Sequence, residues 1–396
     1  MVDVYHNVVL PDECARGIWT LLQHEDLRAA MRVSSSWARS VAPFLYRDID
    51  IRSGPGLQAL LRTTQRRPDL AALVHQLRLH QYTSSGSDHA QSLGSSAASL
   101  LNSLSALREL RLEGHWSGLE ALISNGRLRV PFTNLRDLSL GRRRQSMVHI
   151  LPFWALPRIE SIQVRIAAMD VMCEDAVTSW PTASALTKLT LDYTSLEEKD
   201  VTLLLQHSPS LRSFRYDRWC DVTDEPSFQN CDELGRGLHH LHQTLEQLDL
   251  RVQLYSENAE EVEFLEIDPV RGRLPSFHGF SRLRTLRVPI ATLLGWTPSE
   301  APEIETLLPP SLQHLSLTED LCTQCTYQWT EDSVLTKLDA FFAALAGNEH
   351  KLELIEISPD GTWGGWEDST KEMVQKMATK AGMRCVIVDL AHSHYV

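Results

Sequence analysis

The chain has 396 residues, of which 38 are Lys or Arg and 51 are Asp or Glu, so its formal net charge is −13. This acidic surplus argues against a protein that coats nucleic acid or an anionic membrane, because phosphate groups are bound by clustered cations. A hydrophobic content of 43% with 22% charged residues excludes a disordered chain and is typical of folded domains.

Cysteine usage and the first residues bear on the compartment. The seven cysteines are odd in number and widely spaced, which argues against a disulfide framework and favours a reducing environment. The chain opens without the basic segment of a secretory signal, and no run of about 18–20 apolar residues is present to span a bilayer. We therefore expect a protein of the cytoplasm or the nucleus that contacts no membrane.

Residues 10–46 predict a first domain of three short helices, which we extend to residues 1–51. Pro11 suits the first turn of a helix, and Ile18 and Leu22 lie on one face of the residues that follow. Three helices of this length make too small a core to be stable alone, so we expect the module to pack on a partner or on the next domain.

The second and third helices are predicted from their boundary residues. The second covers residues 26–31. The third begins at the serines of Ser34–Ser36, which can cap a helix, and carries Trp37 and Val41 one turn apart. We expect it to end before Pro43, because proline disfavours the helical conformation in the residue that precedes it.

The order of these residues resembles the F-box. That motif opens with Leu-Pro-x-Glu, continues with an Ile-x-x-x-Leu pair and an acidic residue followed by Leu, and ends in Val-Ser-x-x-Trp. The matching residues are Leu10, Pro11, Glu13, Ile18, Leu22, Asp26, Leu27, Val33, Ser34 and Trp37.

A repeated pattern fills most of the remaining chain. The template L-x-x-L-x-L, in which Ile, Val, Phe or Tyr can replace Leu, occurs ten times at spacings of 24 to 40 residues. Its last two apolar positions lie two apart, as on one face of a strand, and helix-like segments such as 197–206 and 338–346 lie between the strands. A strand and a helix cannot bury an apolar face alone, so stacked units are expected. The repeats begin at Val74, Leu107, Leu135, Ile159, Leu186, Leu211, Leu245, Leu283, Leu312 and Leu352.

This pattern resembles the leucine-rich repeat family, and it predicts an α/β fold in which an irregular solenoid with a curved parallel sheet occupies residues 52–396. The array is irregular because no Asn or Cys stands eight residues after the first Leu, where typical repeats place one. An amphipathic helix over 368–383 and a strand over 385–388 are expected to close it. Inserted loops are predicted near 83–99, 255–277, 318–334 and 358–369.

The combination of an F-box with leucine-rich repeats implies the substrate receptor of a Skp–cullin–F-box type ubiquitin ligase. By this resemblance the protein is not itself an enzyme, needs no cofactor, and binds a Skp-type adaptor, through it a cullin, and an unknown protein substrate. The alternative is a non-catalytic repeat scaffold or inhibitor whose first helices only cap the solenoid. The adaptor-binding residues implied by the motif are Leu10, Pro11, Ile18, Leu22, Leu27, Val33 and Trp37.

The substrate-binding residues are predicted from the polar positions of the strands, which point to the concave face of such a solenoid. Arginine forks suit carboxylate or phosphate groups, and acidic residues among them give a bipolar surface. The alternative is a solvated sheet face without a ligand. The two tryptophans of a Gly-rich segment are either further binding anchors or the plug of the last repeat. The predicted residues are Arg78, Arg108, Arg111, Arg136, Arg212, Arg215, Glu246, Asp249, Arg284, Arg287, Trp363 and Trp366.

Metal and catalytic sites are not predicted. Cys322 and Cys325 form a C-x-x-C pair, but a structural zinc site needs about four ligands and no second pair exists. The sequence contains no phosphate-binding glycine loop, no H-E-x-x-H and no G-x-S-x-G. We therefore expect neither a metal site nor an enzyme.

Overall fold

The computed structural model describes residues 17–80, 87–114, 132–168, 180–221, 228–255, 268–321, 324, 326–347, 350–359 and 366–388, and structural statements below concern these residues. The chain divides into two compact units, Met1–Arg142 and Arg143–Val396. None of the described helices is long and apolar enough to cross a membrane. The domain boundary that the sequence predicts after residue 51 remains a prediction.

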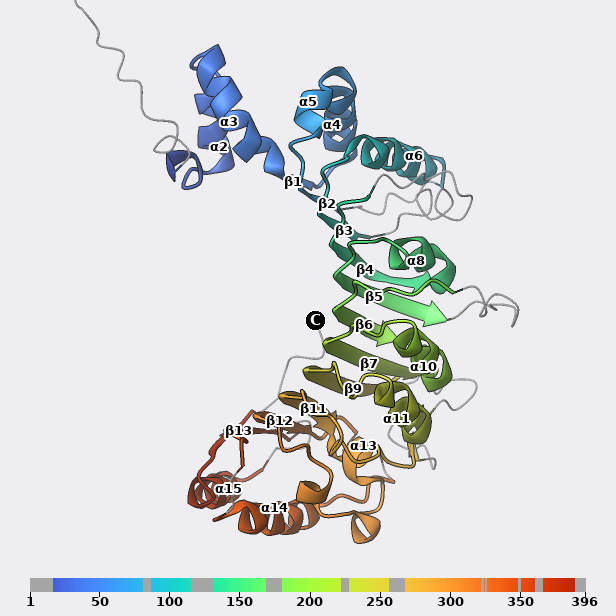
Figure 1. Cartoon of the computed structure of the whole chain (residues 1–396), viewed down its shortest axis with the longest axis vertical. Helices are drawn as coiled ribbons and strands as arrows, with labels where there is room; N and C mark the ends of the chain where they lie inside the picture. The colour runs from blue at the N-terminus through green and yellow to red at the C-terminus, as the bar shows by residue number, and fades with distance from the viewer. Residues whose placement is uncertain are drawn as a thin grey trace, which may run out of the picture. The chain divides into compact units, whose positions relative to one another are not determined.

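The described part of the first unit begins with helical residues 17–19, followed by α2, α3 and then strands that alternate with helices (Figure 1). Strands β1, β2, β3 and β4 pair in this order, and every pair is parallel. The elements are α2 (His24–Ala30), α3 (Ser35–Arg47), β1 (Asp48–Ile51), α4 (Gly54–Arg66), α5 (Pro68–Ala71), β2 (Gln76–His80), α6 (Ser87–Ser103), β3 (Glu109–Glu113) and β4 (Asp137–Ser146), the last of which ends in the second unit.

Helix α3 differs from the predicted third helix at its end. Its beginning is as expected, because the Ser34 side chain accepts a hydrogen bond from the Trp37 backbone at 3.1 Å. It nevertheless continues through Pro43 to Arg47. The prediction that it ends before Pro43 is wrong because Phe44 and Leu45, which follow the proline, pack on the small core, and one exposed proline does not outweigh that packing.

Helix α6 corrects the loop that the sequence predicts near 83–99. The Ser- and Gly-rich composition suggested an inserted loop, yet Ser87–Ser103 is helical. Its second half buries Ala97, Leu100 and Leu101, and the helix packs against α4. Tertiary burial of this apolar stripe outweighs the poor helix propensity of serine and glycine.

The second unit repeats the same arrangement. Strands β5, β6, β7, β9, β11, β12, β13 and β14 follow one another in chain order, with parallel pairing, and β8 and β10 form a separate parallel pair. Figure 1 shows α10 and α11 on the same side of β6, β7 and β9. The strands are β5 (Ser161–Ala168), β6 (Lys188–Thr194), β7 (Ser213–Asp221), β8 (Gln229–Asn230), β9 (Gln247–Tyr255), β10 (Val270–Arg271), β11 (Thr285–Pro289), β12 (His314–Thr318), β13 (Leu354–Ser358) and β14 (Arg384–Ile387).

The helices of the second unit include two that the sequence predicts closely, α10 and α15. Helix α14 also begins with a capping box, in which Thr330 and Ser333 exchange side-chain to backbone hydrogen bonds. The helices are α8 (Met147–Trp154), α10 (Glu198–Gln206), α11 (Cys231–His239), α13 (Ile290–Leu294), α14 (Glu331–Leu345) and α15 (Asp368–Lys380), with short 3₁₀ turns η1 (Pro298–Glu300) and η2 (Ile304–Thr306).

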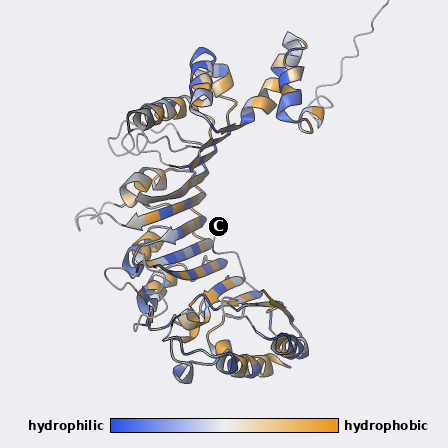
Figure 2. Ribbon diagram, turned by 180° about the vertical axis from the view of Figure 1, so that it is seen from behind, coloured by the Kyte–Doolittle hydropathy of each residue, from blue (hydrophilic) through white to orange (hydrophobic). Residues whose placement is uncertain are grey.

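The repeat pattern is the core of both units. All thirty apolar positions of the ten predicted repeats are buried, none more than 8% exposed. Equivalent positions are also in register, since Phe214 pairs with Leu248 and Leu248 with Leu286. The residues between them alternate in character along each strand, which Figure 2 shows as alternating orange and blue. The leucine-rich-repeat type of α/β fold is therefore confirmed, and we call the side of the sheet that carries the alternate residues the polar face.

A β-bulge interrupts the register between β6 and β7. Leu191 pairs with Tyr216 and Thr194 pairs with Arg218, so two residues of β6, Asp192 and Tyr193, stand opposite one residue of β7. Of the described residues other than glycine, Tyr193 alone has a positive φ, +45°.

A buried polar cluster on the helix side lies directly after this bulge. The Tyr216 hydroxyl donates to the Leu196 carbonyl and to Glu198 Oε1, both at 2.9 Å. Arg218 donates to the same carbonyl at 2.6 Å, and its Nε lies 3.4 Å from Glu198 Oε1. Each of these side chains is almost fully buried, so the cluster fixes the turn between β6 and α10.

Removing Arg218 tests this role. Because Arg218→Ala leaves the Glu198 carboxylate buried without its ion pair, we expect the free energy of unfolding to fall by about 3–5 kcal/mol. Arg236→Ala is the matched control, since its ion pair with Glu233 lies at the surface and should contribute at most about 1 kcal/mol. Urea unfolding followed by circular dichroism measures both, and equal losses would contradict the assignment.

Candidate functional site

The polar face brings the predicted substrate-binding residues into two rows within each unit. One row stands just before the strands, where the backbone of each residue bonds to the next: the Glu246 amide donates to the Arg212 carbonyl at 2.7 Å, and the Arg284 amide to the Glu246 carbonyl at 2.8 Å. The other row stands at the strand centres, where Arg215 pairs with Asp249 and Asp249 with Arg287. In the first unit the corresponding residues are Arg108 and Arg136 before the strands and Arg78 and Arg111 at their centres.

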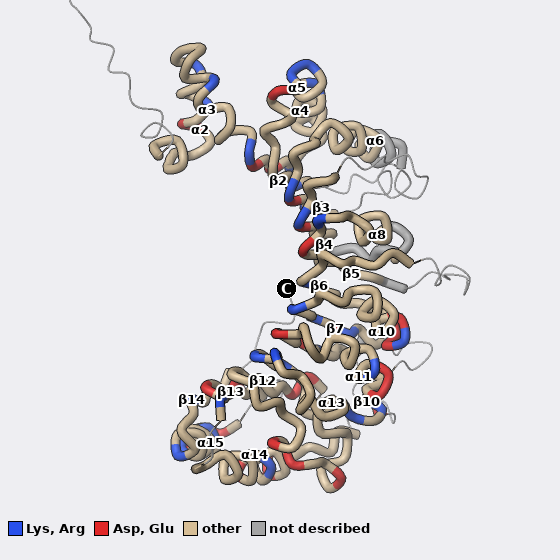
Figure 3. Tube along the Cα trace, in the orientation of Figure 1, with Lys and Arg blue, Asp and Glu red and all other residues tan. Residues whose placement is uncertain are grey.

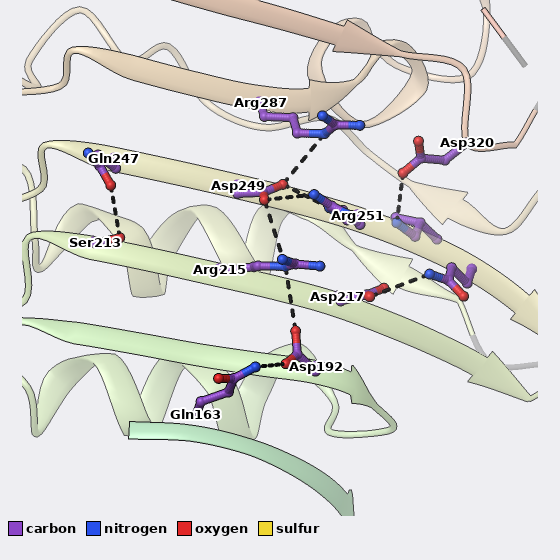
Figure 4. Close-up of polar contacts among 12 residues, drawn as sticks. Gln163, Asp192, Ser213, Arg215, Asp217, Gln247, Asp249, Arg251, Arg287 and Asp320 are labelled. Carbon is purple, nitrogen blue, oxygen red and sulfur yellow. Dashed lines mark hydrogen bonds and ion pairs between the residues drawn. The ribbon is translucent and has the colours of Figure 1, made fainter. Parts of the chain in front are cut away.

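The central row of the second unit is a chain of alternating charges (Figure 4). Arg215 Nε lies 3.7 Å from Asp249 Oδ2, and Arg287 Nε lies 3.7 Å from Asp249 Oδ1. Arg287 continues to Glu356 Oε1 at 3.5 Å. Figure 3 shows Lys/Arg and Asp/Glu positions on the strands from β6 onward. The predicted bipolar surface is thus present, but the charges of its central arginines are already compensated within the chain.

Two members of this chain of charges are not among the residues predicted from the sequence. Arg251 binds both oxygens of Asp249 at 3.1 Å, and Asp192 lies 3.5 Å from Arg215 and accepts a 2.7 Å hydrogen bond from Gln163. Each of these two residues directly follows the last apolar position of its repeat. Extending the alternation by two residues past each repeat would have identified them.

Two carboxylates, Asp217 buried and Asp320 half-buried, lie at the carboxyl-terminal end of this surface. Asp217 is 1% exposed, and only its Oδ2 has a hydrogen-bond donor among the described residues, the Gln253 amide at 3.4 Å. Asp320 accepts a 3.2 Å hydrogen bond from the Val252 amide, which lies beyond the part of β9 that pairs with β11. The Asp320 side chain thereby substitutes for a strand partner where the shorter β11 ends.

Burial controls the pKa of both carboxyl groups. It raises the pKa of Asp217 to about 7, against the opposite effect of Arg215 and Arg251 and with the support of the negative charges of Asp320 and Asp192. Burial also raises the pKa of Asp320, while its hydrogen bonds and the nearby arginines oppose this. This end of the polar face therefore has too few cations and donors for its carboxylates.

An aromatic pair lies beside these acids. The rings of Tyr193 and Trp219 meet edge to face with centroids 5.9 Å apart, and Tyr193 is 38% exposed. The guanidinium of Arg165 stands over both rings, 5.0 Å from the centroid of Tyr193 and 5.6 Å from that of Trp219. The exposure of Tyr193 on the polar face could not be predicted from the sequence, because only the bulge turns its side chain to this face.

Of the two tryptophans predicted as anchors, the structure describes Trp366. Trp366 is 5% exposed, so its indole packs in the interior and the prediction that it is an exposed anchor is wrong. Its burial agrees with the alternative interpretation, in which this tryptophan fills the interior. Trp363 lies outside the described residues.

The first unit carries its own polar contacts on β1, β2 and β3. His80 Nε2 lies 2.9 Å from Asp50 Oδ1, and His80 Nδ1 lies 3.0 Å from Glu113 Oε2, so one imidazole links three strands. Burial acts to raise the pKa of Asp50, but the hydrogen bond from Arg52 and the nearby positive charges hold it below its usual value. This arrangement connects neighbouring strands and presents no converging set of metal ligands.

The predicted adaptor-binding residues separate into buried and exposed groups. Leu27 is buried in a small core with Trp19, and Leu22 is half-buried against that core. Ile18, Val33 and Trp37 are 41%, 63% and 41% exposed. Leu10 and Pro11 lie outside the described residues.

An exposed residue that the motif does not include joins this group. Leu21 is 84% exposed. Of the six large exposed apolar side chains in the described part of the chain, four therefore belong to the helical module. We call Ile18, Leu21, Val33 and Trp37 the apolar patch.

Metal-binding groups and cavities are two other kinds of candidate site. Among the described residues, no group of three or more His, Cys, Asp or Glu side chains could hold a metal ion, and Cys322 and Cys325 lie outside these residues. A cavity of about 990 Å³ beside β10 is lined by residues of both charges, including Asp232, Arg271 and Arg273. None of the predicted site residues lines it.

Comparisons with known proteins add little to this geometry. No model of a known protein family matches the sequence, and no curated protein matches it. Among solved structures, the chain is similar to a chain of the crystal structure of the Rad7 and Elc1 complex in yeast, at 13% sequence identity and a TM-score of 0.39, over 90% of this chain and 91% of that chain. The assignment of the fold rests on the strands and their register.

Asp217 gives a prediction of pH dependence. Its pKa in the folded protein, about 7, is above the ordinary value of 3.8, so the folded state holds the proton more tightly. The stabilising contribution is complete below pH 3.8 and is lost as the pH rises through 7. We expect Asp217→Asn to remove this dependence and to raise the free energy of unfolding, relative to wild type, by about 2–4 kcal/mol more at pH 8 than at pH 4.

Urea unfolding at the two pH values measures the difference. Asp368→Asn is the control, because the side chain of Asp368 is 99% exposed and its substitution should leave the pH dependence as in wild type. An Asp217→Asn variant with the wild-type pH dependence would show that Asp217 is not the titrating group.

Proposed function

We propose that this protein is the substrate receptor of a Skp–cullin–F-box type ubiquitin ligase. In this account the helical module of residues 17–47 binds the adaptor, and through it a cullin, while the polar face of the repeats binds the protein to be ubiquitinated. The receptor supplies no catalytic group. It acts in the cytoplasm or nucleus by holding the target close to the ubiquitin-charged enzyme, which raises the effective concentration of the reacting groups.

The observation that carries this proposal is the apolar patch. Its four large side chains, between 41% and 84% exposed, gather on a module of about 30 residues, although exposed aliphatic side chains cost free energy unless a partner covers them. Three of them, Ile18, Val33 and Trp37, are motif residues of the F-box resemblance. Trp37 also packs edge to face on the buried Trp19, with ring centroids 5.1 Å apart. This packing holds the Trp37 ring in one orientation, in which a partner can contact it.

The scaffold alternative fits this patch less well. A cap would be expected to bury its apolar side chains against the first repeat. Helix α3 does contact α5 and β1, and its carboxyl-terminal end leads directly into β1. The side chains of the apolar patch nevertheless remain exposed to solvent. The small core of Trp19, Leu27 and Val41 supports the module from within and leaves the patch available to a partner.

The polar face supports the second half of the proposal. Parallel strands in register present their central side chains as a continuous surface, and the described part of this surface carries both charges and an aromatic pair. Such a continuous surface of charged and aromatic side chains suits recognition of an extended protein segment.

The adaptor interaction is tested by changing the most exposed members of the patch. We expect Leu21→Glu with Val33→Glu to abolish capture of the protein by an immobilised Skp-type adaptor, because two buried charges at an interface cost several kcal/mol. The wild-type chain should be captured at a one-to-one ratio. Co-purification from a mixture of the two purified proteins measures the effect.

A matched control separates binding from folding. Met373→Glu changes an exposed apolar side chain outside the module, on α15, and should leave capture intact. Leu10→Ala with Pro11→Ala changes two motif residues that precede the described module and should also weaken capture. If the wild-type chain is not captured, the receptor proposal is wrong and the scaffold alternative stands.

A further inference from the structure

The β6–β7 bulge places one strained aromatic side chain beside two acids. Because Asp192 and Tyr193 both stand opposite Asp217, and Tyr193 contacts Arg165 and Trp219 of the same face, the three side chains share one short segment of the polar face. A left-handed backbone costs a tyrosine about 1–2 kcal/mol, and such strain persists only where the surrounding structure enforces it. Here the buried cluster of Tyr216, Arg218 and Glu198 enforces it.

The aromatic pair next to this segment accommodates a guanidinium. Tyr193 and Trp219 together already contact the flat group of Arg165. The outer part of the Tyr193 ring remains exposed, so the aliphatic stem of an incoming side chain can pack against it. An exposed tyrosine with a fixed backbone is also a rigid anchor that loses little conformational entropy on binding.

Asp217 supplies the acceptor for the head of such a side chain. Its Oδ1 is buried and accepts no hydrogen bond within the described part of the chain. The neighbouring arginines do not satisfy it, since Arg251 binds Asp249 and the Nε of Arg215 lies between Asp192 and Asp249. A buried carboxylate oxygen without a donor is destabilising, and a bound donor would remove that cost.

The raised pKa of Asp217 agrees with this shortage of donors, because a bound cation would stabilise the ionised form and lower the pKa. An acidic or phosphorylated segment would instead place more negative charge beside Asp192, Asp217 and Asp320, at a cost in electrostatic free energy. Charge complementarity therefore selects a basic occupant.

We propose that the polar face of the second unit binds a basic, extended segment of a partner protein, with an arginine or lysine side chain packed against Tyr193 and its charged head hydrogen-bonded to Asp217. The inference deepens the proposed receptor role, on which it rests for identifying the segment as part of a substrate. The binding itself requires no adaptor.

The test uses the full-length protein and an array of immobilised fifteen-residue peptides of Gly, Ser and Ala. The peptides carry no charge, one to four Arg, one to four Lys, or one to four Asp. We expect binding to rise with the number of Arg or Lys residues and to be absent from the Asp series. Absence of any basic preference would overturn the proposal.

Variants distinguish this site from general attraction to an acidic protein. We expect Tyr193→Asn and Asp217→Asn each to reduce binding of the four-Arg peptide by about tenfold, because the first removes the aromatic packing surface and the second the charge-assisted hydrogen bond. Asparagine tolerates the left-handed conformation at position 193 and is isosteric with aspartate at 217, so both variants should unfold at or above the wild-type temperature.

Two controls make the comparison specific. Met373→Ala removes another exposed apolar side chain, and Asp368→Asn removes another negative charge, so both should bind the four-Arg peptide as wild type does. Equal binding by all four variants would place the peptide elsewhere and refute the proposal. Because no adaptor is present, failure of adaptor capture and failure of peptide binding are separate results.

Discussion

The fold depends on one constraint: no single strand and helix of this chain can bury its own apolar face, so each repeat must stack on the next. Burial of the three apolar positions in every repeat fixes the register, and the register in turn lines up the residues between them. The polar face is therefore a consequence of core packing. Side chains that are distant in sequence, such as Arg215, Asp249 and Arg287, become neighbours without any local signal that connects them.

Alignment also forces the chain to manage charge. An unbroken row of arginines on neighbouring strands would be destabilising, and in the second unit Asp249 separates Arg215 from Arg287. Most of the described polar face of the second unit is internally compensated in this way, which makes it a weak binding site for a simple anion. The exception lies at the bulge, where one oxygen of Asp217 has no hydrogen-bond donor among the described residues. On the opposite side of the sheet, the buried ion pair of Arg218 and Glu198 holds the strained turn in place.

Residue patterns predicted what depends on periodicity and missed what depends on neighbours. The repeat positions, helix α10 and the closing strand β14 follow from spacing alone, and the structure confirms them. Helix α6 forms in a Ser- and Gly-rich segment because its apolar stripe is buried, and α3 passes through Pro43 for the same reason. Tyr193 could not be predicted, since its orientation depends on a register shift against the adjacent strand. Exposure of Leu21 likewise depends on which side of the turn before α2 the small core occupies.

The central claim is a division of labour between the helical module and the repeats. Hydrogen–deuterium exchange of the full chain, alone and with a purified Skp-type adaptor, tests it directly because it reports the location of contact. We expect adaptor-dependent protection of backbone amides within residues 17–47 and unchanged exchange in β6, β7 and β9. Protection confined to the strands, or no protection in the module at an adaptor concentration that saturates capture, would contradict the account.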